Sequence, residues 1–344
     1  MSKRAHRWVR AGLQALALAV AGFAAAPAQA TTTLVINQLL PPADPFNQQV
    51  LRPWAAEVAK VTQGRVRISI PSAPVAPPDQ LWNAVLGDVV DGAYVFNGLI
   101  PHQLPLEQIA ALPFISGAPG ATSIALWNTY EKFLAKGNDY RNVKLLALFS
   151  LPPGEIFSID RPIVRPADLE GLRLWALPGV PQQVFSRSPA GVVSSPAVQV
   201  SELVAGKTVD AVAGIGDYNA QAFKILGYMK FETVMPGGLS APSFSLVINK
   251  AKWDAISPAD RKAIEHISGL AFARRMELIT SINRRARRHA EKLGLKVLQP
   301  SPALMHELQG YAKPLFANWR ATARARGVDA AAALAYFHQR SQAH

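Results

Sequence analysis

The chain has 344 residues, of which 49% are hydrophobic and 17% charged, with no cysteine and a formal net charge of +13. This length is about twice that of a common domain, so we expect two folded lobes and exclude a disordered chain. The lack of cysteine excludes disulfides, cysteine-liganded zinc or iron–sulfur centres, and a thiol nucleophile.

The first 30 residues have the pattern of a secretory signal. Four basic residues precede an apolar run at 11–26, and Ala28 and Ala30 are the small residues that signal peptidase prefers. The run is shorter than the roughly 20 residues that span a bilayer, so a retained anchor is the weaker interpretation. We predict a periplasmic protein cleaved after Ala30, whose charge falls to +9 because four cationic side chains leave with the signal.

Strand and helix patterns alternate along the next two hundred residues. Residues 33–37 favour a strand, residues 46–61 have helical spacing of apolar side chains, and residues 65–70 alternate as in a strand at a sheet margin. Further strand-like runs occur at 93–96, 143–149, 172–176, 209–213 and 244–249. This alternation predicts an α/β fold.

The C-terminal third has a helical pattern without strand signals. Ser257 is a good N-cap, followed by proline at the first helical position and an acid in the first turn, so a long helix should run to about Leu293. Residues 303–324 and 329–339 follow as helices. The long helix carries an arginine-rich face, which is either solvated or, less favourably, a docking surface for a membrane partner or acidic lipid. Its members are Arg274, Arg275, Arg284, Arg285, Arg287 and Arg288.

Motifs for bond chemistry are absent from the sequence. No two of the seven histidines are spaced to bind a metal from one helix, and there is no Gly-x-Ser-x-Gly elbow, phosphate-binding glycine loop or dinucleotide fingerprint. We therefore expect no metal, no cofactor and no enzymatic activity. An exported protein is also a poor candidate for binding nucleic acid.

Four segments, in order, resemble the substrate-binding subunits of tripartite ATP-independent periplasmic (TRAP) transporters, the DctP-like family. The resemblance covers roughly residues 33 to 300. The segments are the Leu-Pro-Leu and Leu-Pro-Phe landmarks in 104–114, PADLEGLRLW at 166–175, QVSELVAGKTVD at 199–210, and 244–264. The second is similar to the family's D-L-K-G-L-K-I-R stretch, and the third to its E-x-Y-x-A-L-Q-x-G-x-V-D-G helix and strand, with Ser201 in place of tyrosine.

The resemblance implies a periplasmic-binding-protein-like α/β fold. It has two lobes around a ligand cleft, crossing hinge strands and a long helix spanning the back. We place lobe I at 31–152 plus about 242–285, lobe II at 153–241 plus about 286–330, and a C-terminal tail or helix at 331–344. We expect a monomer whose closure on a ligand is read by the membrane subunits of a TRAP permease.

Trp175 is the main departure from the family pattern. In the family that the chain resembles, this position normally holds an arginine that pairs with the ligand's carboxylate. That ion pair is missing here because residue 175 is tryptophan. An indole in the cleft would bind by stacking, whereas the alternative interpretation is core filling. Arg173 is two residues earlier on the same strand face and is a conceivable substitute, although a surface or hinge role is favoured.

The resemblance places further ligand contacts at the ends of other strands. These positions are Asn37, Gln38, Phe96, Asn97, Glu155, Phe157, Gly214, Asp217 and Tyr218. Asp217 is equally consistent with a cap on the following helix, which we favour. Four of the positions, Phe96, Phe157, Trp175 and Tyr218, would make an aromatic cleft.

These observations lead to the hypothesis of a solute-binding protein that delivers a small organic acid, either aromatic or weakly charged, to a TRAP permease. One alternative is a ligand sensor for a membrane receptor, since the same closing fold serves both roles. A less favoured alternative is a secreted enzyme with Glu155 or Asp217 as general base.

Overall fold

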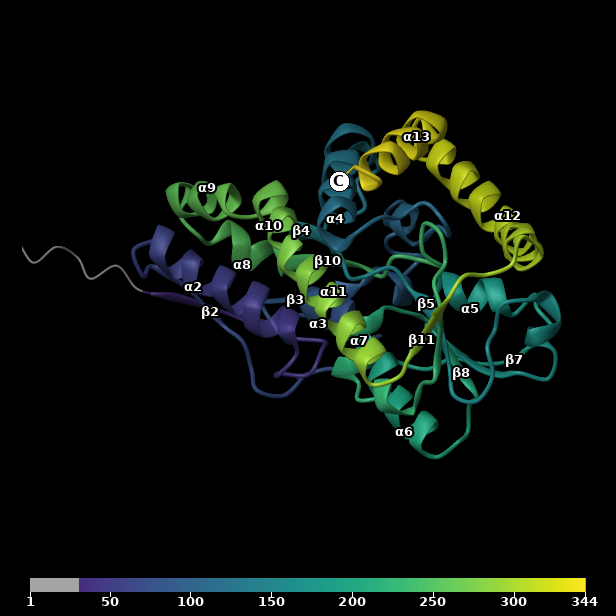
Figure 1. The fold of residues 1–344 in the computed structure, drawn as a ribbon. Helices are drawn as coiled ribbons and strands as arrows, with labels where there is room; N and C mark the ends of the chain where they lie inside the picture. The colour runs from purple at the N-terminus through teal and green to yellow at the C-terminus, as the bar shows by residue number, and fades with distance from the viewer. Residues whose placement is uncertain (1–30, 344) are drawn as a thin grey trace, which may run out of the picture.

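The computed structural model describes residues 31–343, which form two mixed α/β lobes (Figure 1). The predicted signal segment and its cleavage site after Ala30 lie outside the described residues. None of the helices between residues 31 and 343 combines the length and the apolar character needed to cross a membrane. The predicted two-lobed α/β architecture is confirmed.

The first sheet has the strand order β2-β1-β3-β10-β4. Its strands are β1 Thr32–Asn37, β2 Val66–Ser69, β3 Gly92–Phe96, β4 Val143–Ser150 and β10 Ser243–Asn249. Strands β2, β1 and β3 are parallel, and β10 runs antiparallel to both β3 and β4. All five were predicted from hydrophobic runs, and β2 lies at the sheet edge as its alternating pattern indicated.

The second sheet has the order β11-β9-β5-β8-β6-β7. Its strands are β5 Glu155–Ser158, β6 Arg173–Ala176, β7 Gly191–Val193, β8 Ala211–Ile215, β9 Phe231–Thr233 and β11 Lys296–Leu298. Strand β8 is parallel to β6 and antiparallel to β5. Strand β11 shows that the prediction of a C-terminal third without strands was wrong, because three residues are too few for a readable alternation.

Helices cover both sheets. Those in the first 300 residues are α2 Arg52–Val61, α3 Leu81–Leu86, α4 Pro119–Thr129, α5 Val180–Phe185, α6 Val200–Ala205, α7 Asp217–Ala222, α8 Lys250–Asp254, α9 Pro258–His266, α10 Gly269–Arg275 and α11 Glu277–Lys292. They are followed by α12 Pro302–Ala325 and α13 Ala330–Ser341. Short 3-10 segments include Asn97–Leu99 and Glu107–Ala111, and a π-helical turn at Asn47–Leu51 leads into α2.

The predicted long helix from Ser257 to Leu293 is three helices. Ser257 caps α9 as expected, and its Oγ accepts a hydrogen bond from the backbone N–H of Asp260 at 3.1 Å. The helix ends at His266 because the chain turns at Gly269, where φ is +53° and a Cβ would lie 2.6 Å from the Trp127 ring. The spacing of apolar residues correctly predicted helix in this region, but it did not predict the break at Gly269.

Two crossing segments and one helix connect the lobes. Residues 151–154 lead from β4 to β5, and residues 234–242 return from β9 to β10. These segments are paired, since Gly154 N–H donates to the Ser240 carbonyl at 2.7 Å and Leu151 N–H donates to the Pro242 carbonyl at 2.9 Å. Helix α11 contacts both α4 and α7, and so spans the two lobes (Figure 1). The residue limits of the lobes stay a prediction.

Candidate functional site

A cavity lies where strands of both sheets end. Leu39 and Leu40 follow β1, Phe96 ends β3, Leu177 follows β6 and Ile215 ends β8, and all of them line it. Ligands of α/β proteins bind outside the carboxyl ends of the strands, because the loops there converge. The empty volume is about 550 Å³, counting the part open to solvent.

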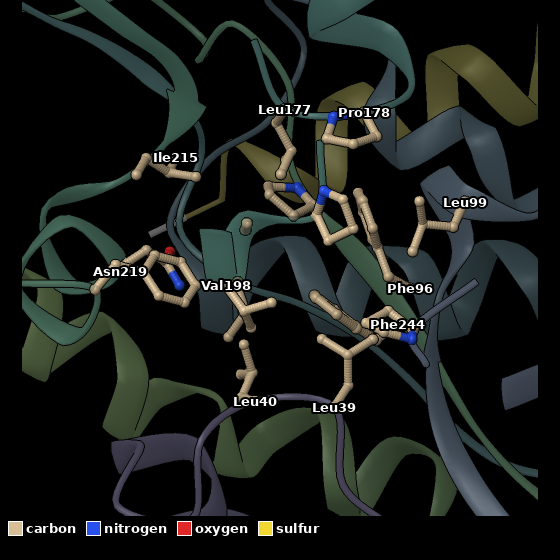
Figure 2. Close-up of a pocket in the computed structure, with 16 residues that line it drawn as sticks. Leu39, Leu40, Phe96, Leu99, Leu177, Pro178, Val198, Ile215, Asn219 and Phe244 are labelled. Carbon is tan, nitrogen blue, oxygen red and sulfur yellow. The ribbon is translucent and has the colours of Figure 1, made fainter. Parts of the chain in front are cut away.

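The cavity wall is almost entirely hydrocarbon. Figure 2 shows Ile215 and Asn219 on one side and Phe96 and Leu99 on the opposite side. No charged side chain is among the lining residues, and Asn219 is the only one with a polar side chain. The sixteen are Leu39, Leu40, Pro78, Phe96, Leu99, Leu151, Leu177, Pro178, Pro196, Ala197, Val198, Ile215, Asn219, Phe223, Pro242 and Phe244.

An aromatic stack supports one wall. The Phe96 and Phe244 ring centroids are 5.3 Å apart, and the Phe244 ring stacks on Phe149 at the same separation with an interplanar angle of 12°. Phe149 in turn stacks on Phe46 at 4.6 Å. The Phe244 ring is therefore held in place by rings behind it, and Phe96 packs on Phe244.

Helix α7 presents Asn219 to the cavity. Tyr218 N–H donates to the Asn283 side-chain oxygen at 2.9 Å, and the Tyr218 hydroxyl donates to Asp44 Oδ1 across the lobes. Asn219 is 3% exposed, and its Oδ1 has no hydrogen-bond partner among residues 31–343. Burial raises the pKa of Asp44 to about 6, against the hydrogen bonds from Tyr218 and the Phe46 N–H, which lower it.

Beside α7 lies a buried ion cluster of Arg287, Asp217, Glu232 and Glu155, which we call the Arg287 cluster. The guanidinium Nη2 is 3.0 Å from Asp217 Oδ2 and 3.8 Å from Glu155 Oε1, and it donates to Glu232 Oε1. Glu155 Oε2 also accepts the Met235 N–H at 2.6 Å. Burial raises the pKa of Glu155 and of Glu232, and the Asp217 charge raises that of Glu232 further.

The structure corrects three sequence-based interpretations of α7 and α11. Arg287 is not on a solvated face, because its side chain is only 29% exposed and pairs with carboxylates of the second lobe. Leu293, predicted in the apolar stripe, is instead 69% exposed. Asp217 is not a helix cap: Gly216 occupies the N-cap position without a side-chain bond, and Asp217 is the first helical residue. Its carboxylate pairs with Arg287 instead.

Trp175 lies behind the cavity wall. Its side chain is fully buried, and Nε1–H donates to Ser195 Oγ at 3.1 Å. Residues 196–198, directly after that serine, line the cavity. Arg173 is exposed at the other end of β6, where its Nε donates to Asp210 Oδ2 at 3.0 Å. Neither side chain is among the lining residues in this structure.

Five of the other predicted positions are buried in supporting roles. Asn37 Oδ1 accepts the Val75 N–H at 2.6 Å, and Gln38 Nε2 donates to the Pro71 carbonyl at 2.8 Å, so both hold the loop that carries Pro78. Asn97, Phe157 and Gly214 are likewise buried: Asn97 Oδ1 accepts from Ser245 Oγ at 2.7 Å, Phe157 packs in the core, and Gly214 has φ +97°.

Among the predicted contacts, Phe96 is the one that lines the cavity. A direct ligand contact by the others stays a prediction. Sequence reasoning missed Asn219, which lies two residues after the predicted Asp217, and the apolar residues Leu39, Leu177 and Phe244. The three apolar residues could have been found from their positions, because each lies within two residues of a strand end, whereas Asn219 lies inside α7, four residues after β8.

Comparisons with known proteins agree over almost the whole described chain. The family model described as bacterial extracellular solute-binding protein, family 7 (DctP), matches residues 36–322. A protein of Comamonas testosteroni described as the outer membrane transporter protein TsaT is 39% identical over 312 residues, which cover 91% of this chain and 92% of that protein.

Solved structures are similar over the same range. A TRAP periplasmic solute-binding protein from Bordetella bronchiseptica with bound (R)- and (S)-mandelate has a TM-score of 0.84 and 27% identity, covering 90% of this chain and 99% of that one. A marine metagenome TRAP solute-binding protein from an unidentified microbe, specific for aromatic acid ligands and bound to metahydroxyphenylacetate, has a TM-score of 0.80 and 25% identity, with 90% and 98% covered. The chain therefore belongs to the bacterial extracellular solute-binding proteins of family 7, the DctP family of TRAP transporter solute-binding proteins.

Proposed function

We propose that this protein captures a small aromatic acid with one carboxylate in the cavity between its lobes and delivers it to a TRAP permease. The family binds solutes and has no enzymatic activity. The observation that carries the choice of ligand is the composition of the wall, which is hydrocarbon and aromatic apart from Asn219.

Stacking and apolar burial supply the binding energy in this proposal. The rings of Phe96 and Phe244, tilted by 34° to each other, offer aromatic faces for a ligand ring, and an aromatic pair contributes about 0.5–1.5 kcal/mol beyond the area that it buries. A dicarboxylate would have to lose its hydration against a wall without any cationic side chain, which is costly. The relatives solved with mandelate and metahydroxyphenylacetate hold ligands of the proposed class.

Closure of the lobes would couple capture to delivery. The wall takes Phe96 and Phe244 from the first sheet and Leu177 and Ile215 from the second, so one ligand contacts both lobes. A ligand that binds the closed form better than the open form shifts the population toward closure. We propose that closure takes place in the periplasm, once the signal segment has been cleaved after Ala30, and that the permease recognises the surface of the closed form.

Calorimetric titration of the protein beginning at Thr31 tests the proposal. Benzoate, mandelate and phenylacetate should bind, and succinate and malate should bind at least tenfold more weakly. Phe244→Leu should weaken benzoate binding by about threefold to tenfold, through the loss of ring stacking. Phe185→Leu is the matched control, because Phe185 is equally buried in the second lobe but does not line the cavity. Preferential binding of succinate, or no binding of any aromatic acid, would refute the proposal.

A further inference from the structure

An acid group bound in this cavity needs hydrogen-bond donors. A carboxylate moved from water into apolar surroundings without partners loses much of its hydration energy. In the family pattern discussed above an arginine meets this need, but Trp175 takes that position here and is itself buried behind the wall. The lining residues include no lysine, arginine or histidine.

Asn219 is the lining residue that can meet this need. The residue is 3% exposed, and its Oδ1 is buried with no partner among residues 31–343. An amide has two N–H donors and one acceptor oxygen, and a half-turn about its last torsion exchanges the two ends. A buried polar atom left without a partner is unfavourable, and Oδ1 by itself calls for a donor. With the amide turned over, its NH2 group takes that place and donates to an incoming carboxylate.

The neighbouring residues hold this amide in place. Asp217 pairs with Arg287 at 3.0 Å, and the Tyr218 hydroxyl donates to Asp44 on the first lobe. Successive helical side chains point in directions about 100° apart, so α7 directs Asp217, Tyr218 and Asn219 to three different neighbours. Figure 2 shows Asn219 on the side of the cavity opposite Phe96 and Leu99.

We propose that Asn219 binds the acid group of the ligand and sets the preference for one carboxylate. This inference rests on the proposed function and adds the orientation of the ligand to it. The acid end meets the Asn219 amide, and the ring lies toward Phe96 and Phe244. One amide supplies donors for a single carboxylate, so a second carboxylate on the far side of the ring would face hydrocarbon and lose its hydration.

The test compares benzoate with its neutral isostere benzamide, by calorimetry at about pH 8. Asn219→Leu should weaken benzoate by about tenfold to a hundredfold, the range for a lost hydrogen bond to a charged group. It should weaken benzamide less, because that head group is uncharged. Asn219→Asp should shift the ratio of the two affinities further toward benzamide, whose N–H groups can donate to the new carboxylate.

Val198→Ala is the control, since it enlarges the same cavity without touching its polar group. It should weaken both ligands alike and leave their ratio unchanged. The inference is overturned if the unaltered protein binds benzoate and both Asn219 variants keep the benzoate-to-benzamide ratio within twofold. Failure of the unaltered protein to bind any aromatic acid overturns the proposed function itself, and with it this inference.

Discussion

Replacing Arg287 by methionine should destabilise the protein more than any other change to the arginines of α11. The change keeps much of the apolar stem but leaves Asp217, Glu232 and Glu155 without their shared cation. Removing one partner of a buried ion pair costs about 3–5 kcal/mol. Because the Arg287 side chain keeps 29% exposure, we take the lower end, about 3 kcal/mol, which for a chain of this size lowers the melting temperature by roughly 5 °C.

The destabilisation should depend on pH in a defined direction. Burial and mutual repulsion already raise the pKa of Glu155 and Glu232, and loss of the cation raises both further. The folded state then binds protons more tightly than the unfolded chain, so its stability falls as pH rises above the usual glutamate range. The deficit of Arg287→Met should therefore be larger at about pH 8 than at about pH 5, where the carboxyl groups hold protons.

Thermal and urea melts at both pH values measure this difference. Arg285→Met is the matched control, because Arg285 is exposed on the same helix and makes none of the ion pairs found in residues 31–343. Its melting temperature should stay within about 1 °C of the unaltered protein, as expected for a surface substitution. Equal losses in the two variants, or a deficit for Arg287→Met that is the same at both pH values, would show that the reasoning is wrong.

Three further changes separate stability from ligand binding. Because burial raises the Asp44 pKa from 3.8 to about 6, ionising it in the folded state costs about 3 kcal/mol, and Asp44→Asn should remove that loss of stability between about pH 4 and 6 in melting curves. Trp175→Phe removes the donor to Ser195 Oγ, so calorimetry should show benzoate weakened severalfold with about 1 kcal/mol of stability lost; unchanged affinity would leave Trp175 a core residue only. Gly214→Ala should lower the melting temperature strongly, since φ is +97° and a Cβ would lie 2.7 Å from a proline, whereas Gly227→Ala, with open space around it, should not.

Hydrophobic periodicity predicted the long elements and failed on short ones. Strands β4 and β10 have eight and seven residues, which is enough to show a continuous apolar run. Strands β7, β9 and β11 have three residues each and are defined by their partners in the sheet, which the sequence does not reveal. The break before α10 depends on Gly269 meeting the Trp127 ring, a contact between residues more than a hundred positions apart.

The cavity was harder to predict because its wall comes from many places. Phe96 was predicted from the family resemblance, whereas Leu40 and Leu177, which also follow strands and line the cavity, pass in the sequence as ordinary core residues. Arg287 was wrongly predicted to lie on an exposed basic face, although it is part of a buried ion cluster. Among six arginines on one helical stretch, only the tertiary position of α7 and β9 shows that this one pairs with buried carboxylates.

Trp175 connects the departure in the sequence to the character of the cavity. A cation at that position would have to be accommodated beside a wall with no anionic partner, and the indole avoids that cost by packing into the core. Its single polar atom binds Ser195, whose neighbours Pro196, Ala197 and Val198 form part of the wall. The indole thus carries no charge and is hydrogen-bonded to the segment that forms part of the apolar wall. In the proposed binding mode, ring packing supplies the affinity for an aromatic monoacid and the Asn219 amide supplies the polar recognition.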